Sequence, residues 1–231
     1  MKIGVLRTGW PPRAEQAQFG SYPEMFRQLL GVDAYEWTEF AVDQGVLPAT
    51  PKACDAYIIT GSARGVYDAD PWIGQLIDFL RAAKGRAKLV GVCFGHQVMA
   101  EAFGGTVIKS PKGWAIGAQD YGVAGREPWM DGVASVRLPA SHQDQVVEVP
   151  PGAEVILASA FTPMAGLVYR DQPAISIQPH PEFEPAYAKA LIESRREVVY
   201  SDAHADAAAA SYDLPDDRVR VASWIRGFLA G

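Results

Sequence analysis

Short apolar runs alternate with longer amphipathic stretches in the first half of the chain. The apolar runs predict buried strands at residues 2–6, 33–40, 55–60 and 88–92. In the amphipathic stretches apolar residues recur every three or four positions, which predicts helices over 22–30, 71–83 and 95–103. The polar, proline-bearing residues 8–21 are predicted to form a loop. Such strand–helix alternation is typical of a doubly wound parallel sheet.

The second half of the chain has more closely spaced strand-like segments. Short strands are predicted at 106–108 and 135–138, and an antiparallel meander at 146–149, 154–158 and 164–169. A further apolar strand is predicted at 174–178, and helices over about 185–200 and 219–229. The alanine-rich residues 203–210 fit either a helix or a loop. We find no repeat and no clear boundary. We therefore expect one domain over 1–231, with a core at about 2–195 and a C-terminal helical extension at about 196–231.

Composition narrows the class of protein. The chain has 231 residues, 48% of them hydrophobic and 21% charged, with a net charge of −6. No cluster of basic residues forms a nucleic-acid footprint, since Arg195 and Arg196 are only a pair followed by Glu197. No apolar run approaches the 18 residues of a membrane span, and the N-terminal apolar run is too short for a secretory leader. The two cysteines form no disulfide framework, so we expect a cytoplasmic protein.

Cys93 is the strongest candidate for chemistry. It follows the apolar run 88–92 directly and precedes a helical pattern, which places it on a tight strand-to-helix turn. Gly91 and Gly95 lie two residues either side and remove side chains where such a turn is crowded. A helix N-terminus favours the thiolate, which is the nucleophile. We therefore predict covalent catalysis through Cys93.

His180 is the best candidate for the base that serves Cys93. It follows the predicted strand 174–178, at the edge of a parallel sheet where the catalytic side chains of such folds meet. Glu182 lies two residues further on, and an extended backbone, favoured by Pro181, places both side chains on one side. Glu182 is thus predicted to orient one ring nitrogen and leave the other for Cys93.

The other histidines and the second cysteine have simpler interpretations. We expect His96 to be a structural histidine bonded to a neighbouring loop, and His204 to be solvated. His142, in a polar turn, either lines the pocket or anchors the loop, and Cys54 is expected to be a buried apolar residue. No histidine or cysteine pair has metal-ligand spacing, so we predict no metal and no cofactor.

Acyl transfer also requires donors for the developing oxyanion. The amide of Phe94, directly after the nucleophile, is one predicted donor. The amide of Gly61, at the end of the strand 55–60, is the second, because glycine lets the backbone approach a ligand closely.

Three segments together resemble the class I glutamine amidotransferase family, whose glutaminase uses a Cys-His-Glu triad. They are Gly-Val-Cys-Phe-Gly-His-Gln at 91–97, Ser-His-Gln-Asp-Gln-Val at 141–146 and Gln-Pro-His-Pro-Glu at 178–182. The similarity runs from about residue 2 to about residue 195. It implies a flavodoxin-like, mostly parallel, seven-stranded core with a small antiparallel sheet added.

The resemblance also implies a reaction and a set of substrate contacts. Cys93 attacks the side-chain amide of glutamine or of a γ-glutamyl group, and His180 protonates the leaving ammonia or amine before it activates water. Gln97, and the loop with Gln143 and Asp144, are implied to bind the amino-acid end of the substrate. Ser62 is expected to contact it as well, although Gly61-Ser62-Ala63 departs from the Gly-Gly-Pro of many family members.

Three functions remain open at this point. The first is a glutaminase that releases ammonia for a separate synthetase, since no synthetase domain is present in these 231 residues. The second is a self-contained hydrolase of γ-glutamyl amides or peptides with the same triad. The third is a non-catalytic regulatory protein of this fold, against which the complete set of Cys93, His180 and Glu182 argues.

Overall fold

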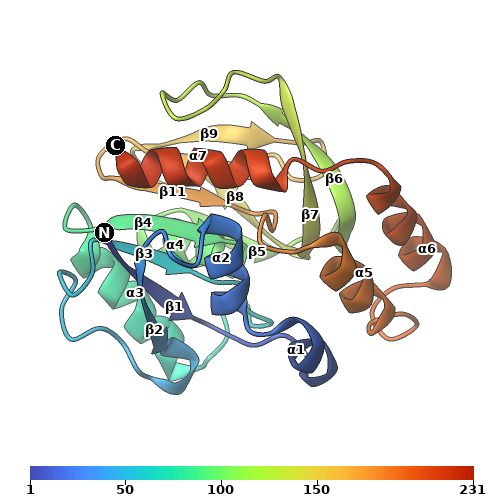
Figure 1. The fold of residues 1–231 in the computed structure, drawn as a ribbon, viewed down its shortest axis with the longest axis horizontal. Coiled ribbons are helices and arrows are strands. Elements are labelled where there is room, and N and C mark those ends of the chain that lie inside the picture. Colours follow the sequence, from blue (N-terminus) through green and yellow to red (C-terminus); the bar gives the residue numbers. More distant parts are fainter.

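A nine-stranded sheet with the order β2-β1-β3-β4-β11-β10-β9-β6-β7 runs through the molecule (Figure 1). The structure is a computed structural model that describes residues 1–231. Five neighbouring strands are parallel: β2 (Glu36–Ala41), β1 (Lys2–Arg7), β3 (Ala56–Ile59), β4 (Lys88–Val92) and β11 (Ala174–Ile177). The other four pair antiparallel: β10 (Gly166–Tyr169), β9 (Ala153–Ala158), β6 (Ala115–Val123) and β7 (Ser135–His142).

A separate two-stranded antiparallel sheet joins β5 (Thr106–Lys109) to β8 (Asp144–Glu148). The predicted fold class, a doubly wound, mostly parallel sheet with a small antiparallel sheet, is therefore confirmed, although the main sheet has nine strands rather than seven. The predicted meander was wrong in one strand. Residues 146–148 belong to β8 in the small sheet, whereas β9, β10 and β11 are consecutive antiparallel neighbours in the main sheet.

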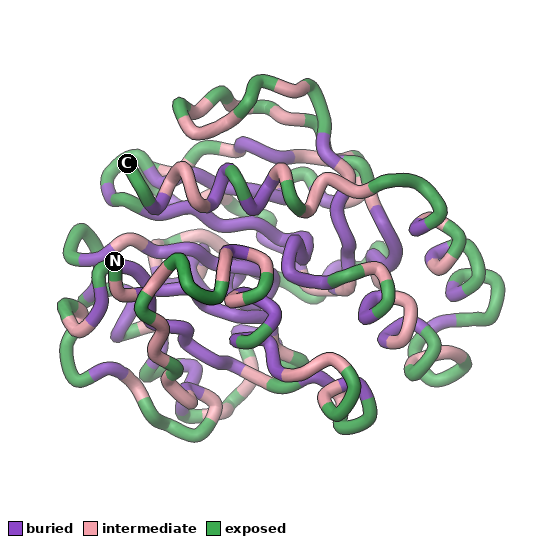
Figure 2. The backbone as a smooth tube through the Cα atoms, in the orientation of Figure 1, coloured by how far each residue is buried: buried purple, intermediate pink, exposed green.

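Helices cover both faces of the main sheet. On one face α3 (Pro71–Ala83) and α4 (Phe94–Ala102) pack on Tyr57, Ile59 and Leu89, and on the other α2 (Tyr22–Leu30) and α7 (Arg218–Ala230) pack on Ile58 and Val90. Successive strand residues thus enter opposite cores, which explains why these strands are continuously apolar in the sequence. Figure 2 shows the resulting buried centre beneath helices whose outer sides are exposed. The C-terminal segment expected at 196–231 ends in α7, which forms part of this second core.

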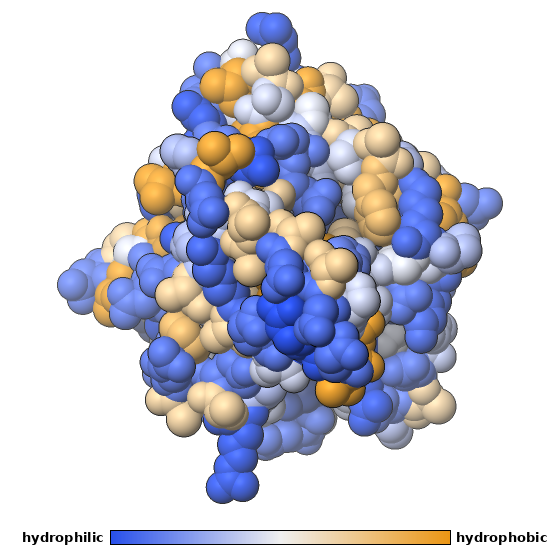
Figure 3. Space-filling view, turned by 90° about the vertical axis from the view of Figure 1, so that its right-hand side faces the viewer, coloured by the Kyte–Doolittle hydropathy of each residue, from blue (hydrophilic) through white to orange (hydrophobic).

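A third cluster lies at one end of the sheet, where α1 (Arg13–Phe19), α5 (Pro185–Glu193) and α6 (Asp202–Ala210) gather. Two short 3-10 turns, η1 (Val42–Gln44) and η2 (Ser211–Asp213), complete the regular structure. The face that carries this end is largely hydrophilic, with small hydrophobic patches between (Figure 3). No helix combines the length and the apolarity that crossing a bilayer requires.

The helices with clear end signals have the predicted bounds. A capping box between Ser21 and Glu24 starts α2, and Gly31 follows its last residue; α3 starts at Pro71. Two expectations were wrong. The loop predicted at 8–21 contains α1, whose Arg-Ala-Glu-Gln-Ala-Gln run has no apolar periodicity and which packs through Phe19 on Tyr187.

The helix predicted over 185–200 ends at Glu193 instead. The following turn is closed by the Val199 N–H, which donates to the Arg195 carbonyl at 2.9 Å, and Glu197 takes a left-handed φ of 57°. Of the two possibilities for 203–210, the structure shows the helix α6. It packs against β6, a strand that was not predicted, at Gly117, whose φ is 81° and where a Cβ would meet Ala208 at 2.9 Å.

Candidate active site

Cys93 occupies the turn between β4 and α4 in a strained backbone conformation. Its φ of 54° and ψ of −105° lie in a region that residues other than glycine avoid, a strain of about 1–3 kcal/mol. A Cβ at Gly95 would approach the Ile59 carbonyl oxygen to 2.2 Å, and one at Gly91 would approach the Gly95 oxygen to 2.5 Å. Both glycines are thus required by the close approach of chain segments, and the thiol is fixed at the carboxyl edge of the sheet.

His180 and Glu182 follow β11, the strand next to β4. The backbone N–H of His180 donates to the Pro139 carbonyl at 2.8 Å, and its Nδ1 lies 2.7 Å from Oε1 of Glu182. The ring stacks on Phe183 with centroids 3.8 Å apart and an interplanar angle of 8°. Since an ionised carboxylate only accepts hydrogen bonds, the Nδ1 proton faces Glu182 and Nε2 is left for the cavity.

The charges around His180 favour its protonated form. Burial alone would lower its pKa, but the negative charges of Cys93 and Glu182 outweigh burial and raise it. A Cβ built on Gly61 would lie 3.1 Å from His180 Cε1 and 3.8 Å from Cys93 Cβ, so these three residues enclose one small space. The predicted nucleophile, base and orienting carboxylate are therefore brought together.

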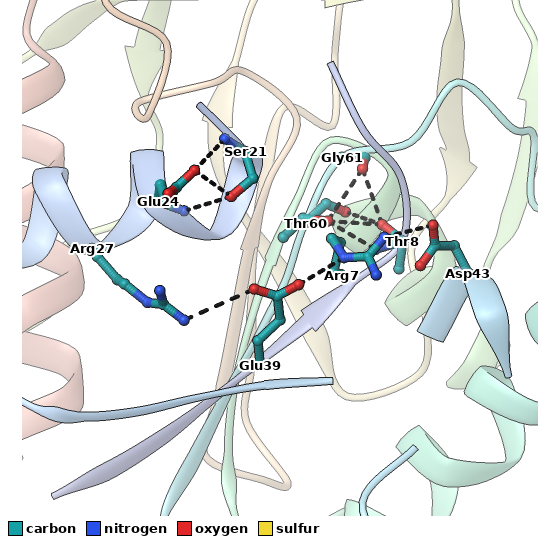
Figure 4. Close-up of polar contacts among 9 residues, drawn as sticks. All are labelled: Arg7, Thr8, Ser21, Glu24, Arg27, Glu39, Asp43, Thr60 and Gly61. Carbon is teal, nitrogen blue, oxygen red and sulfur yellow. Dashed lines mark hydrogen bonds and ion pairs between the residues drawn. The ribbon is translucent and has the colours of Figure 1, made fainter. Parts of the chain in front are cut away.

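The Gly61 peptide is held in place by two threonines (Figure 4). The Thr60 carbonyl accepts from the Gly95 N–H at 3.2 Å and from the Thr8 hydroxyl at 2.9 Å. The N–H of the same trans peptide, that of Gly61, points in the opposite direction from this carbonyl, and Gly61 lines the cavity. Phe94 is the first residue of α4, so its N–H has no intrahelical partner. Gly61 and Phe94, the residues of the two predicted oxyanion donors, thus both lie beside Cys93.

An ion-pair chain supports the same edge of the sheet. Arg7 is almost fully buried and pairs with Glu39 at 2.8 Å and with Asp43 at 2.7 Å (Figure 4). Its guanidinium also lies 4.0 Å from the ring centroid of Trp10, which lines the cavity. Arg7 therefore couples the end of β1 to the wall of the site.

The four predicted substrate-binding residues all line the same cavity, which has a volume of about 570 Å³. Gln97 Nε2 donates to the Asp144 carbonyl and to Gln178 Oε1, both at 3.1 Å. Gln143 donates to the Ser110 carbonyl at 3.3 Å, and Ser62 Oγ accepts from the Arg64 N–H at 3.2 Å. The Asp144 carboxylate accepts from the Tyr67 hydroxyl at 2.9 Å, and burial raises its pKa.

The remaining histidines have distinct positions. His142 lines the cavity and also anchors the chain, because its Nδ1 lies 3.1 Å from the Asp144 carbonyl oxygen; burial lowers its pKa to about 3. His96 is fully buried on α4, 2.8 Å from the Ser176 hydroxyl on β11, and the backbone of Met164, in the loop before β10, also meets its ring. His204 is exposed on α6 and Cys54 is buried. No group of His, Cys, Asp and Glu side chains has an arrangement that could hold a metal ion.

Several lining residues were not singled out from the sequence as site residues. Phe183 and Arg195 are the clearest. For the loop tryptophans Trp10, Trp114 and Trp129 the sequence left open a pocket role or a surface or packing role, and Trp10 and Trp114 lie on the cavity wall. Phe183 follows the His-Pro-Glu segment directly, which is the only signal that the sequence offered for it. Trp129 lies elsewhere, packed edge-on against Phe228.

The family model described as glutamine amidotransferase class-I matches residues 27–196. The chain belongs to the class I glutamine amidotransferase family. A glutamine amidotransferase-like protein of Schizosaccharomyces pombe is 29% identical over 98% of both chains. Gamma-glutamyl peptidase 4 of Arabidopsis thaliana is 28% identical over 71% of this chain and 69% of its own length.

The fold of this class I amidotransferase is shared by solved structures. A glutamine amidotransferase of Thermotoga maritima superposes over 100% of this chain and 99% of its own, with a TM-score of 0.79 at 15% identity. The flavodoxin-like fold described above is therefore that of the family.

Proposed function

We propose that this protein hydrolyses the γ-amide bond of glutamine or of a γ-glutamyl compound through a thioester on Cys93. The proposal rests on one observation. A cysteine on a strained turn faces a buried histidine that is paired with Glu182 at 2.7 Å. This is the arrangement of an activated nucleophile, its base and the group that orients the base.

The reaction proceeds in two steps, formation of the thioester and its hydrolysis. The Cys93 thiolate adds to the amide carbon, and the resulting oxyanion accepts from the amides of Gly61 and Phe94. His180 gives its proton to the leaving nitrogen as the C–N bond breaks, which leaves a γ-glutamyl thioester. His180 then takes a proton from water, the hydroxide adds to the thioester, and the C–S bond breaks to release glutamate, which restores the Cys93 thiolate beside protonated His180.

The identity of the leaving amine separates the two hydrolytic functions. A glutaminase releases ammonia and needs a separate synthetase to use it. The cavity of about 570 Å³ and its aromatic wall leave room for a larger amine, and a γ-glutamyl peptidase is among the relatives. These observations favour the self-contained hydrolase. Because Cys93 has to stay reduced, we place the protein in the cytoplasm.

Two matched cysteine variants test the proposal. Cys93→Ala should reduce the hydrolysis of both glutamine and γ-glutamylglycine to background, because the thioester cannot form. Cys54→Ala, which removes the other buried free thiol, should keep the wild-type rate. A glutamine-like chloroketone should label Cys93 and spare Cys54 by mass spectrometry. Full activity of Cys93→Ala would exclude this nucleophile.

Assays of the purified protein alone distinguish the two hydrolytic functions. Faster turnover of γ-glutamyl peptides than of glutamine, with no partner present, is expected for the self-contained hydrolase. Weak turnover of glutamine that rises when a synthetase is added would instead identify an ammonia donor.

A further inference from the structure

The wall of the cavity next to His180 is aromatic. The leaving amine receives its proton from His180, so in the proposed reaction it lies on this side. Phe183 stacks on the imidazole, and Tyr22 stacks on Phe183 with centroids 5.9 Å apart. Trp114 lines the same cavity. These rings form one surface that leads away from the reacting nitrogen.

Arg195 brings a positive charge to that surface. It follows α5, is half-buried, and its guanidinium carbon lies 5.6 Å from the ring centroid of Trp114. Its Nη1 donates only to two neutral hydroxyls, those of Ser141 and Tyr200, both at 3.4 Å. Its Nε and Nη2 donate to no protein group, and no carboxylate lies within ion-pair distance.

The next residue in the chain shows what is unusual about Arg195. Arg196 is paired with three carboxylates, those of Glu193 at 2.7 Å, Asp202 at 3.0 Å and Asp206 at 2.8 Å. Adjacent arginines therefore have opposite surroundings. A guanidinium that is withdrawn from water gains most from a carboxylate that it binds with two parallel hydrogen bonds. Arg195 has two free donors for such a partner and faces the cavity that takes the substrate.

The other two cations on the cavity wall are less suited to this role. Arg64 already pairs with Asp70 at 3.3 Å. Lys109 is exposed, and its charge acts on Asp144, in the part of the cavity assigned to the amino-acid end of the substrate. Of the three cations, Arg195 is therefore the one that lies beside the aromatic surface next to His180.

We propose that Arg195 binds a carboxylate on the leaving amine, so that the preferred substrates are γ-glutamyl amino acids or short γ-glutamyl peptides. The assignment rests on the proposed amide hydrolysis and adds to it the class of leaving group. Trp114 and Phe183 flank this position and accommodate the side chain or backbone of the departing residue.

A pair of substrates that differ only in this carboxylate tests the inference. γ-Glutamylglycine and γ-glutamylethylamide have leaving groups of similar size, with and without a carboxylate. The wild type should show about a 10- to 100-fold higher kcat/KM for γ-glutamylglycine, the range expected for hydrogen bonds to a charged group. Arg195→Met should bring the ratio of the two values close to one. Arg195→Lys should keep part of the preference. Arg196→Met, with its charge outside the cavity, should keep the wild-type ratio.

Two results would overturn the inference. One is a wild type without preference between the two compounds. The other is an Arg195→Met variant that loses activity on both compounds equally, which would assign Arg195 to the carboxylate shared by both. Binding of the two compounds to Cys93→Ala, measured by calorimetry, gives the same preference without chemistry. Failure of hydrolysis and failure of this inference are therefore distinguishable.

Discussion

Two segments of the chain, 141–146 and 178–183, each bring a buried histidine to the same cavity, and the two histidines have opposite properties. His142 and His180 are both 3% exposed. Burial lowers the pKa of His142 to about 3, whereas the pKa of His180 is raised although burial opposes this. The depth of a histidine therefore does not decide its protonation in this cavity. The charges of the groups that its ring meets, Cys93 and Glu182 for His180, decide it.

The two segments also share a sequence pattern, since each places an acidic residue two positions after the histidine. In the second segment the Glu182 carboxylate meets the imidazole at 2.7 Å. In the first, the Asp144 carboxylate bonds to Tyr67 and only the Asp144 carbonyl meets the ring, at 3.1 Å. A carbonyl dipole positions a neutral imidazole, whereas a carboxylate with a full charge stabilises an imidazolium. In the proposed reaction one segment thus supplies a proton carrier and the other a neutral hydrogen-bonding group.

Replacing each histidine in turn tests this division with the largest expected effect. His180→Asn should lower kcat for γ-glutamyl amides by about 10⁴-fold or more, because both proton transfers are lost. His142→Asn keeps a donor at the Nδ1 position for the Asp144 carbonyl and should lower kcat by less than about tenfold. Circular dichroism should show that both variants fold. Equal losses would mean that the two segments share the proton transfer.

Glu182→Gln should make the second segment resemble the first. The amide still holds the ring but carries no charge, so the pKa of His180 should fall and kcat should drop by about 10²- to 10³-fold. The basic limb of the kcat/KM profile, where His180 loses its proton, should move to lower pH. A limb that stays in place would show that Glu182 does not set this pKa, and a loss as large as that of His180→Asn would show that Glu182 does more than orient and charge the ring.

Local patterns in the sequence were sufficient for the parts of the site that local geometry fixes. The apolar run 88–92, two glycines and a cysteine predict the turn at Cys93, since only a small residue fits where Gly95 meets Ile59. The strand exit at 178–182 predicts the pairing of His180 with Glu182. His180 and Glu182 are close in the chain, and Gly95 follows β4 closely and meets the end of the adjacent strand β3.

Contacts between distant segments could not be predicted from such local patterns. Thr8 holds the Gly61 peptide across 53 positions. Arg195 lines the cavity from the turn that follows α5, which ends at Glu193. Arg195 and Arg196 were indistinguishable as a basic pair, since the sequence does not show which of them faces carboxylates. The sequence also did not show that the Asp144 carboxylate would turn away from His142. Its hydrogen-bond donor, Tyr67, is 77 positions away.

The smallest expected difference between the two histidines is in how the free energy of unfolding depends on pH under acidic conditions. Because the pKa of His142 is lowered from its ordinary 6.5 to about 3, the unfolded chain binds one more proton than the folded chain between these values. Its contribution is fully present above pH 6.5 and is lost as the pH falls towards 3. His180 has a raised pKa and is protonated in both the folded and the unfolded state at pH 4–6, so its contribution to stability changes only when the pH rises above that range.

Urea unfolding at pH 4, 5 and 6 should therefore show that His142→Asn reduces the slope of unfolding free energy against pH by about 1.4 kcal/mol per pH unit. His180→Asn should leave this slope unchanged, and a flatter slope in that variant would mean that His180, like His142, is neutral in the folded protein.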